Sequence, residues 1–281
     1  MKILLTGADG FTGFHFIKKC QDLNINVISL KSDLLNLNDL EIEIKHLNID
    51  YVVHLAGISF VANKDVDIFN SVNVLGTRNL LSALKNMNKR PSKILLASTA
   101  NIYKSIQSGL IKESDVIDPI NPYAKSKLKM EQMAIELFGK FFTFIIVRPF
   151  NYTGKNQNVK FLIPKIINHF KKKSNSIELG ALDVKREFND VRYVVDCYIS
   201  LLKNLEKNEI INICTGNSYN VKEVLNKMES ISKHSLQINI NPDFIRNNEI
   251  QNLAGSPEKL LNTSLIKNNY SLDNTLMWMY K

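Results

Sequence analysis

Short apolar runs alternate with longer amphipathic segments through the first half of the chain. The runs that we expect to form strands are KILLTG at 2–7, NVISL at 26–30, YVVHLAG at 51–57, KILLAST at 93–99 and FFTFIIVRPF at 141–150. Apolar residues recur with helical spacing between them, at 14–23, 40–47, 74–89 and 128–138. Continuously apolar strands that alternate with helices are typical of a parallel sheet covered on both faces. Residues 1–150 therefore predict an α/β fold, a Rossmann-type doubly wound parallel sheet.

The rhythm changes after residue 150. Helical patterns at 161–173, 191–205 and 221–232 are separated by short strand-like pieces such as SIEL at 176–179 and IINIC at 210–214. This order predicts a smaller, mixed α/β lobe in residues 151–281, placed beside the sheet of residues 1–150. We expect some of its segments, including a final strand and helix, to return to the main sheet.

Composition excludes several classes of protein. Of the 281 residues, 44% are hydrophobic and 22% charged, which is ordinary for a globular protein. No apolar run reaches the roughly 20 residues that a membrane span needs, and the apolar part of MKILLTGADG is too short for a signal peptide. The three cysteines are odd in number and widely spaced, at 20, 197 and 214. We expect reduced thiols in the cytoplasm, with no metal site and no membrane association.

The chain carries a net charge of +9. A basic protein can bind nucleic acid or an anionic small molecule. Here lysine, asparagine and isoleucine are abundant throughout, and the one dense cluster, KKK at 171–173, closes a helical pattern where cations offset the helix dipole. We therefore expect no nucleic-acid partner.

The spacing of glycines after the first strand predicts a phosphate-binding loop. TGADGFTG opens a helix and spaces its glycines as G-x-x-G-x-x-G. The first glycine permits a tight turn, the second lets the backbone approach a pyrophosphate, and the third lets the helix pack on the strand. The helix N-terminus then presents free N–H groups to the phosphates. We expect a nicotinamide dinucleotide on this loop, held by Gly7, Asp9, Gly10, Phe11, Thr12 and Gly13.

The residues that close the second strand separate the two nicotinamide cofactors. An acidic residue there binds the adenosine ribose and repels a 2′-phosphate. In this chain NVISL is followed by Lys31 and Ser32, a cation and a hydroxyl that suit a 2′-phosphate. Asp33, with Leu34 beside it, instead favours contact with the ribose or the adenine. The pattern favours NADPH and leaves NADH open.

These motifs together resemble the extended short-chain dehydrogenase/reductase family, over nearly the whole chain. The segments that carry the resemblance are TGADGFTG, HLAG at 54–57, NVLGT at 73–77, LLASTANIY at 95–103, NPYAKSK at 121–127 and RPFNYTG at 148–154. LGALDVKREFNDV at 179–191, INICTGNSYNVKEVL at 211–225 and GSPEKL at 255–260 resemble the sugar-binding half of GDP-6-deoxy-D-mannose reductases and GDP-mannose 4,6-dehydratases.

The resemblance implies a catalytic role for Tyr123, Lys127 and Thr99. In this family the tyrosine of Y-x-x-x-K protonates a carbonyl oxygen as hydride arrives, and residues i and i+4 share one helix face. Lys127 and the oxidised nicotinamide are expected to lower the pKa of the phenol. Thr99, preferred over Ser98, is expected to bond the reacting oxygen of the sugar. The resemblance also places Leu55, Ala56, Gly57, Asn73 and Arg148 at the cofactor.

The residues after Thr99 favour one reaction. Nucleotide-sugar 4,6-dehydratases carry an acid and a base there, whereas this chain has Ala100 and Asn101. We therefore expect a 4-ketoreductase of an NDP-4-keto-6-deoxy sugar, with GDP-4-keto-6-deoxy-mannose as the preferred substrate, in the synthesis of surface polysaccharide precursors. A 4-epimerase with tightly bound NAD is the alternative. A 4,6-dehydratase or a non-catalytic dinucleotide-binding module fits less well.

The resemblance places the nucleotide sugar on the second lobe. Guanidinium groups suit bidentate phosphate contacts, and a polar residue after RPF lies at the carboxyl end of a strand, where α/β ligands bind. The expected substrate contacts are Thr99, Asn101, Asn151, Lys165, Gly180, Arg186, Arg246 and Glu249. We interpret His54, inside an apolar strand, as a packed structural histidine. Members of the family pair through helices at positions like 74–89 and 122–138, so we expect a homodimer.

Overall fold

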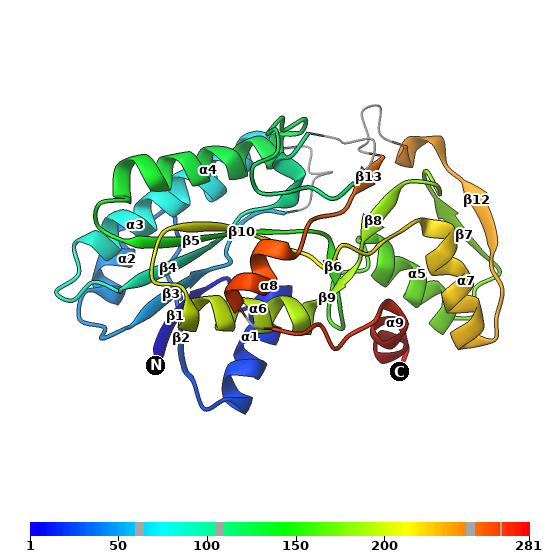
Figure 1. Cartoon of the computed structure of the whole chain (residues 1–281), viewed down its shortest axis with the longest axis horizontal. Helices are drawn as coiled ribbons and strands as arrows, with labels where there is room; N and C mark the ends of the chain where they lie inside the picture. Colours follow the sequence, from blue (N-terminus) through cyan, green and yellow to red (C-terminus); the bar gives the residue numbers. More distant parts are fainter. Residues whose placement is uncertain (60–64, 105–108, 246–250, 265) are drawn as a thin grey trace.

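A six-stranded parallel sheet forms the centre of the larger lobe in this computed structural model, which describes residues 1–59, 65–104, 109–245, 251–264 and 266–281 (Figure 1). The strand order is β10-β5-β4-β3-β1-β2. The strands are β1 (Lys2–Thr6), β2 (Asn26–Ser29), β3 (Tyr51–His54), β4 (Lys93–Ala97), β5 (Thr143–Pro149) and β10 (Glu209–Ile213). All five neighbouring pairs are parallel.

Helices cover both faces of this sheet (Figure 1). On one face α2 (Leu37–Ile44), α3 (Thr77–Lys85) and α4 (Pro122–Phe138) bury an apolar core that includes Leu80, Met130 and Ile146. On the other face α1 (Phe11–Asp22) and α6 (Val191–Asn204) pack around Phe16 and Tyr198, with α8 (Glu258–Ser264) against α6 and β10. The prediction of a doubly wound α/β fold is confirmed.

The helix that carries Tyr123 begins earlier than the apolar pattern predicts. The pattern indicated 128–138, whereas α4 begins at Pro122. Asn121 is its N-cap and accepts the Ala124 N–H at 2.8 Å, and proline at the first helical position loses no hydrogen bond that the helix needs. Tyr123 therefore lies in the first turn of α4, with Lys127 one turn later.

Two short helical pieces border this region. A π-helical stretch, η1 (Phe69–Gly76), leads directly into α3, so the helical segment predicted at 74–89 starts before residue 74 and ends as α3 at Lys85. A 3₁₀ turn, η2 (Ala100–Ile102), follows β4. Widened π turns occur frequently at functional sites. In this chain the stretch contains Asn73, one of the residues expected at the cofactor.

In the described residues, the second lobe is built from short strands and three helices around its own core, which includes Phe170, Leu225 and Leu276. Its helices are α5 (Leu162–Lys171), α7 (Val221–Ser232) and α9 (Leu272–Tyr280). Its small sheets have the orders β11-β8-β13, β12-β7 and β6-β9. The strands are β6 (Tyr152–Thr153), β7 (Ser176–Leu179), β8 (Lys185–Glu187), β9 (Asn189–Asp190), β11 (Ser218–Tyr219), β12 (Gln237–Ile240) and β13 (Asn252–Leu253), and a 3₁₀ turn, η3 (Pro242–Phe244), follows β12.

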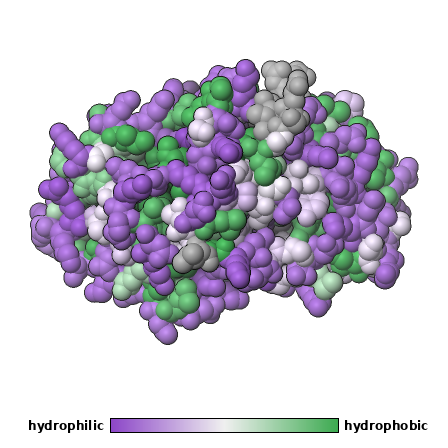
Figure 2. Space-filling view, viewed as in Figure 1, coloured by the Kyte–Doolittle hydropathy of each residue, from purple (hydrophilic) through white to green (hydrophobic). Residues whose placement is uncertain are grey.

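The face drawn in Figure 2 is mostly hydrophilic, with apolar side chains dispersed between polar ones. Within the described ranges no helix has both the length and the apolar character needed to cross a bilayer. The same ranges hold no cluster of side chains suited to a metal ion. Cys20, Cys197 and Cys214 are buried free thiols.

Candidate active site

The glycine loop after β1 is pressed against the segment that follows β3. Gly7 has φ +71°, a left-handed conformation that glycine adopts without strain. A Cβ on Gly7 would lie 2.7 Å from the Ala56 nitrogen, and one on Gly13 would lie 2.1 Å from the Gly7 carbonyl oxygen. Only glycine fits these two contacts, so the loop and the N-terminus of α1 form the close-packed turn that a pyrophosphate requires.

A buried series of hydrogen bonds leads from Asn73 to Ala56, the residue that packs against the glycine loop. Thr77 donates to the Asn73 carbonyl at 2.7 Å, so its oxygen accepts the Nε2–H of His54 at 2.8 Å. The Nδ1 of His54 then accepts from the Thr6 hydroxyl at 2.7 Å, and Thr6 accepts the Ala56 N–H at 3.1 Å. Burial, followed by the nearby Lys127 charge, lowers the pKa of His54 to about 3. These contacts fit the interpretation of His54 as a neutral structural group.

Asn73 connects this series of hydrogen bonds to α4, the helix that bears Tyr123. Its Oδ1 accepts the Ile58 N–H at 2.8 Å, and its Nδ2 donates to Ser126 Oγ at 2.9 Å. A Cβ on Gly57 would lie 2.8 Å from Asn73 Oδ1 and 3.2 Å from Lys127 Nζ. The structure thus brings the predicted cofactor residues Leu55, Ala56, Gly57 and Asn73 together with Gly7 and Lys127.

Thr99, Tyr123 and Lys127 meet at the carboxyl ends of β4 and β5. Thr99 lies two residues after β4 and caps η2. Its hydroxyl lies close enough to Tyr123 to lower the pKa of the phenol, and Lys127 Nζ donates to the Ala97 carbonyl at 2.8 Å. All three side chains are buried. In open α/β sheets, ligands bind at this end of the strands, so the three groups converge where a substrate is expected.

The electrostatics of the pair differ from the expectation in one respect. Burial raises the pKa of the Tyr123 phenol, and the nearby Thr99 hydroxyl only partly opposes this rise. Burial also lowers the pKa of Lys127 to about 8, although Glu131 opposes this. In the chain itself the tyrosine is therefore held as a neutral phenol. A neutral phenol is the form that can donate a proton.

The segment after Thr99 provides amide groups and no carboxylate. Both the backbone N–H and the Nδ2 of Asn101 donate to Thr99 Oγ1, at 3.2 and 3.1 Å. Ser98 Oγ is buried and has no hydrogen-bond partner in the part of the chain that the structure describes. The contacts therefore favour Thr99 over Ser98 as the hydroxyl of the site, and Asn101 orients it.

Arg148 lies inside a buried ion pair. Its guanidinium donates to Glu131 through Nε at 3.1 Å and through Nη2 at 2.6 Å. Nη1 donates to the Tyr103 hydroxyl at 2.9 Å, and Tyr103 in turn donates to Asn212 at 2.7 Å. Arg148 and Glu131 are only 2% and 3% exposed. This geometry does not agree with the expected contact between Arg148 and the cofactor, because the guanidinium already donates to Glu131 on α4 and to Tyr103.

The end of β2 holds a carboxylate that the sequence pattern did not place there. Glu43, on α2, accepts the N–H of Lys31 at 2.9 Å, the N–H of Ser32 at 2.7 Å and the Ser32 hydroxyl at 2.5 Å. Hydrogen bonds from Ser32, then from the Lys31 backbone, outweigh desolvation and lower its pKa. Asp33 is exposed and caps its own turn through the Leu35 N–H, while Leu34 is buried in the core.

On the side of the second lobe, Asn151 is exposed and lies two residues after the end of β5. The next residue, Tyr152, was not among the predicted site residues. Its hydroxyl lies 2.8 Å from Thr12 Oγ1 of the glycine loop, its ring stacks on Phe11 at 5.9 Å, and it interacts electrostatically with Tyr123. Its position inside RPFNYTG was the available signal. Asp9 and Gly10 remain exposed at the loop tip.

The other expected substrate residues lie farther along the second lobe. Lys165 on α5 donates to the Glu178 carbonyl at 2.7 Å and lies 4.5 Å from the Phe244 ring centroid. A Cβ on Gly180 would lie 2.6 Å from the Phe244 carbonyl oxygen, so these residues form one cluster. Arg186, in β8, donates to the Lys185 carbonyl at 2.8 Å. Arg246 and Glu249 fall outside the described residues.

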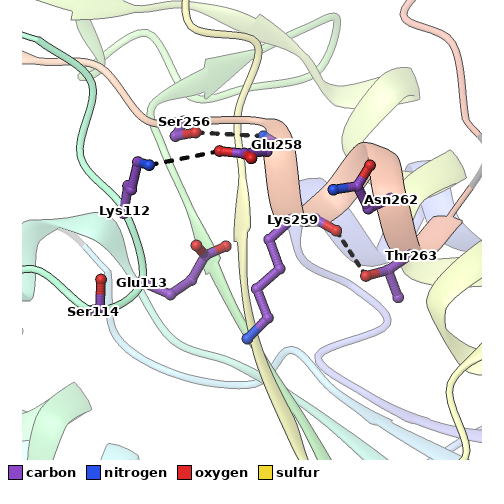
Figure 3. A pocket seen from close by; sticks show the side chains of 8 residues that line it. All are labelled: Lys112, Glu113, Ser114, Ser256, Glu258, Lys259, Asn262 and Thr263. Carbon is purple, nitrogen blue, oxygen red and sulfur yellow. Dashed lines mark hydrogen bonds and ion pairs between the residues drawn. The ribbon is translucent and has the colours of Figure 1, made fainter.

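A cavity of about 380 Å³ lies apart from these groups. Its lining includes Lys112, Glu113, Ser256, Glu258 and Lys259, and Figure 3 shows Lys112 paired with Glu258 across it. None of the predicted catalytic residues lines it. The lining carries both signs of charge, Lys112 is already paired, and Glu113 accepts the Asn212 N–H at 2.8 Å. We assign this cavity no part in the site.

Sequence comparisons agree with this geometry. The profile of the NAD dependent epimerase/dehydratase family matches residues 3–214. The chain belongs to this family. The GDP-6-deoxy-D-talose 4-dehydrogenase of Aggregatibacter actinomycetemcomitans is 36% identical over 100% of this chain and 97% of the relative. The GDP-6-deoxy-D-mannose reductase of Pseudomonas aeruginosa is 29% identical over 94% of this chain and 90% of the relative.

Solved structures of this epimerase/dehydratase family show the same fold. RMD from Pseudomonas aeruginosa, complexed with NADPH, superposes with a TM-score of 0.90 at 28% identity, over 99% of this chain and 96% of that one. The predictions of an extended short-chain dehydrogenase/reductase and of an NAD(P)-dependent enzyme are therefore confirmed. The close-packed glycine loop fits the pyrophosphate of such a cofactor.

Proposed function

We propose that this protein is an NAD(P)H-dependent 4-ketoreductase of a GDP-linked 4-keto-6-deoxy sugar, acting on precursors of surface polysaccharide. The proposal rests on three buried groups, Thr99, Tyr123 and Lys127. Ala100 and Asn101 follow Thr99, where a dehydratase would carry a second acid and base. Both curated relatives named above act, by name, on GDP-6-deoxy sugars. A 4-dehydrogenase and a 4-ketoreductase run the same chemistry in opposite directions.

The residues present suit the reductive direction. A reduced nicotinamide held at this site would supply a hydride to C4, and the carbonyl oxygen would have to gain a proton as its bond order falls. Thr99 Oγ1, held by two donors from Asn101, lies beside Tyr123 and is placed to bond that oxygen. Tyr123 remains a neutral phenol because burial raises its pKa, and it donates the proton. The Lys127 ammonium then stabilises the phenolate that is left.

The proposal is tested by incubating the protein with GDP-, dTDP-, CDP- and UDP-linked 4-keto-6-deoxy sugars and either reduced dinucleotide. Consumption of NADPH or NADH is followed at 340 nm, and the product is identified by NMR. We expect turnover with the GDP sugar and a 6-deoxyhexose product. Release of a tightly bound NAD on denaturation, with C4 inversion and no net oxidation, would instead identify the 4-epimerase alternative.

A matched pair of variants tests the role of the phenol. We expect Tyr123→Phe to lower kcat by about 10²–10⁴-fold, the usual contribution of general acid catalysis, while dinucleotide affinity changes little. Tyr51→Phe makes the same chemical change at the amino end of β3, whereas the site lies at the carboxyl ends of the strands. This variant is expected to leave kcat unaltered. Equal losses in both variants would contradict the role given to Tyr123.

We also propose a cytoplasmic homodimer formed through residues 74–89 and 122–138. Exposed apolar side chains on these segments, Leu75, Ile135 and Leu137, support the proposal, since each is between 46% and 49% exposed in the single chain. The three free thiols fit a reducing compartment. Light scattering at micromolar concentration is expected to give twice the chain mass, and Ile135→Lys is expected to shift it toward the monomer.

A further inference from the structure

The carboxylate of Glu43 lies on the donors that would otherwise receive an anion at the end of β2. Two consecutive backbone N–H groups, of Lys31 and Ser32, point at it, and the Ser32 hydroxyl adds a third contact. All three distances fall between 2.5 and 2.9 Å. Charge-assisted bonds of this length to a carboxylate are about twice as strong as neutral ones. These donors are therefore firmly engaged within the chain.

The topology places these donors at the adenosine end of the dinucleotide site. β2 is the immediate parallel neighbour of β1, and the Leu30 N–H donates to the Leu5 carbonyl just before the glycine loop. In dinucleotide-binding βαβ units the residue about 20 positions after the glycines meets the ribose 2′-oxygen. Lys31 and Ser32 occupy that position, 18 and 19 residues after Gly13.

We propose that Glu43 sets the cofactor preference by standing where a 2′-phosphate would bind, so that the protein favours NADH over NADPH. The inference rests on the proposed dinucleotide site and goes beyond it. Lys31 and Ser32 by themselves suit a 2′-phosphate, but Glu43 already bonds the N–H groups and the hydroxyl. A phosphorylated ribose would have to displace a carboxylate that carries the same sign of charge. An unphosphorylated ribose adds no charge and leaves the three contacts intact.

Binding of nucleotide fragments tests this without any turnover. We expect 5′-ADP to bind the unmodified protein at least tenfold more tightly than 2′,5′-ADP in isothermal titration calorimetry. In Glu43→Gln one negative charge is removed, and we expect the affinity for 2′,5′-ADP to rise by about ten- to a hundredfold. The affinity for 5′-ADP should change less than about threefold. The kcat/KM ratio for NADPH over NADH should move in the same direction.

Glu41→Gln is the matched control, because it makes the same change two residues earlier on α2. Glu41 accepts from Asn86 at 2.8 Å, on the other side of the helix from Lys31, and its variant should leave both affinities unaltered. Glu43→Asp, which withdraws the carboxylate by one methylene, should shift the ratio less than Glu43→Gln. It also serves as the second variant if Glu43→Gln folds poorly. Lys31→Gln should weaken 2′,5′-ADP selectively.

Two results would overturn the inference. One is tighter binding of 2′,5′-ADP than of 5′-ADP to the unmodified protein. The other is an unchanged ratio of the two affinities in both Glu43 variants. If neither nucleotide binds the unmodified protein at all, the dinucleotide site itself is wrong, and this outcome is distinct from a failure of the role given to Glu43.

Discussion

Removing one partner of the Glu131–Arg148 pair should destabilise the protein without weakening its hold on the dinucleotide. Arg148 is only 2% exposed, and Glu131→Gln removes the negative charge that pairs with its guanidinium. Breaking one side of a buried ion pair costs about 3–5 kcal/mol, because the remaining charge stays desolvated. Arg148→Met should cost a similar amount, since Glu131 is then left buried and charged.

The double variant Glu131→Leu/Arg148→Met separates the pair from its surroundings. Replacing both charges by apolar groups removes the desolvation problem. What remains lost is the 2.9 Å bond from Arg148 to the Tyr103 hydroxyl, worth about 1 kcal/mol, because Tyr103 still donates to Asn212. We therefore expect the double variant to be more stable than either single one, by roughly 2 kcal/mol or more.

Urea unfolding followed by circular dichroism measures these differences, and differential scanning calorimetry should show single variants melting lower by roughly 6–15 °C. Dinucleotide affinity, measured by calorimetry at a temperature where every variant is folded, should stay within about threefold. A tenfold loss of affinity in Arg148→Met at unchanged stability would refute the reasoning. It would return Arg148 to the cofactor site.

Three further outcomes follow from the geometry. Thr99→Ala should lower kcat/KM by at least about tenfold, and Thr99→Ser should restore most of it, because the hydroxyl is the group proposed to bond the substrate oxygen. Steady-state kinetics measure both changes. Since the pKa of Lys127 is about 8, kcat/KM should fall as pH rises through 8, and Lys127→Arg should move that decline above pH 10. If kcat/KM of the unmodified enzyme stayed constant up to pH 10, the requirement for a protonated Lys127 would be contradicted. The pKa of His54 is about 3 in the fold and 6.5 when unfolded, so protonation favours the unfolded chain as pH falls from 6.5 toward 3. Urea unfolding at pH 7 and 4.5 should show a loss of roughly 2–3 kcal/mol that His54→Gln lacks, and equal losses would refute it.

Local patterns in the sequence determined the fold class and marked Tyr123 and Lys127 as a candidate pair. Apolar strands and helical periodicity depend on neighbouring residues alone, so they predict the parallel sheet before any contact is known. The glycine spacing and the i, i+4 relation of Tyr123 and Lys127 are equally local, because a tight turn and one helical turn fix their geometry. The same relation extends to Glu131, four residues beyond Lys127, whose role the sequence analysis missed.

Only the tertiary structure decided which partner each polar group has. Arg148 lies in the motif RPFNYTG yet bonds Glu131, 17 residues earlier, and Tyr103, 45 residues earlier. Glu43 reaches Ser32 because α2 folds back over the end of β2, and no local pattern marks it. The sequence specifies which side chains can carry a charge, but the burial and the neighbours of each side chain depend on how distant segments pack together. The fold and the family could therefore be predicted from the sequence, whereas the partners and pKa shifts of the polar side chains could not.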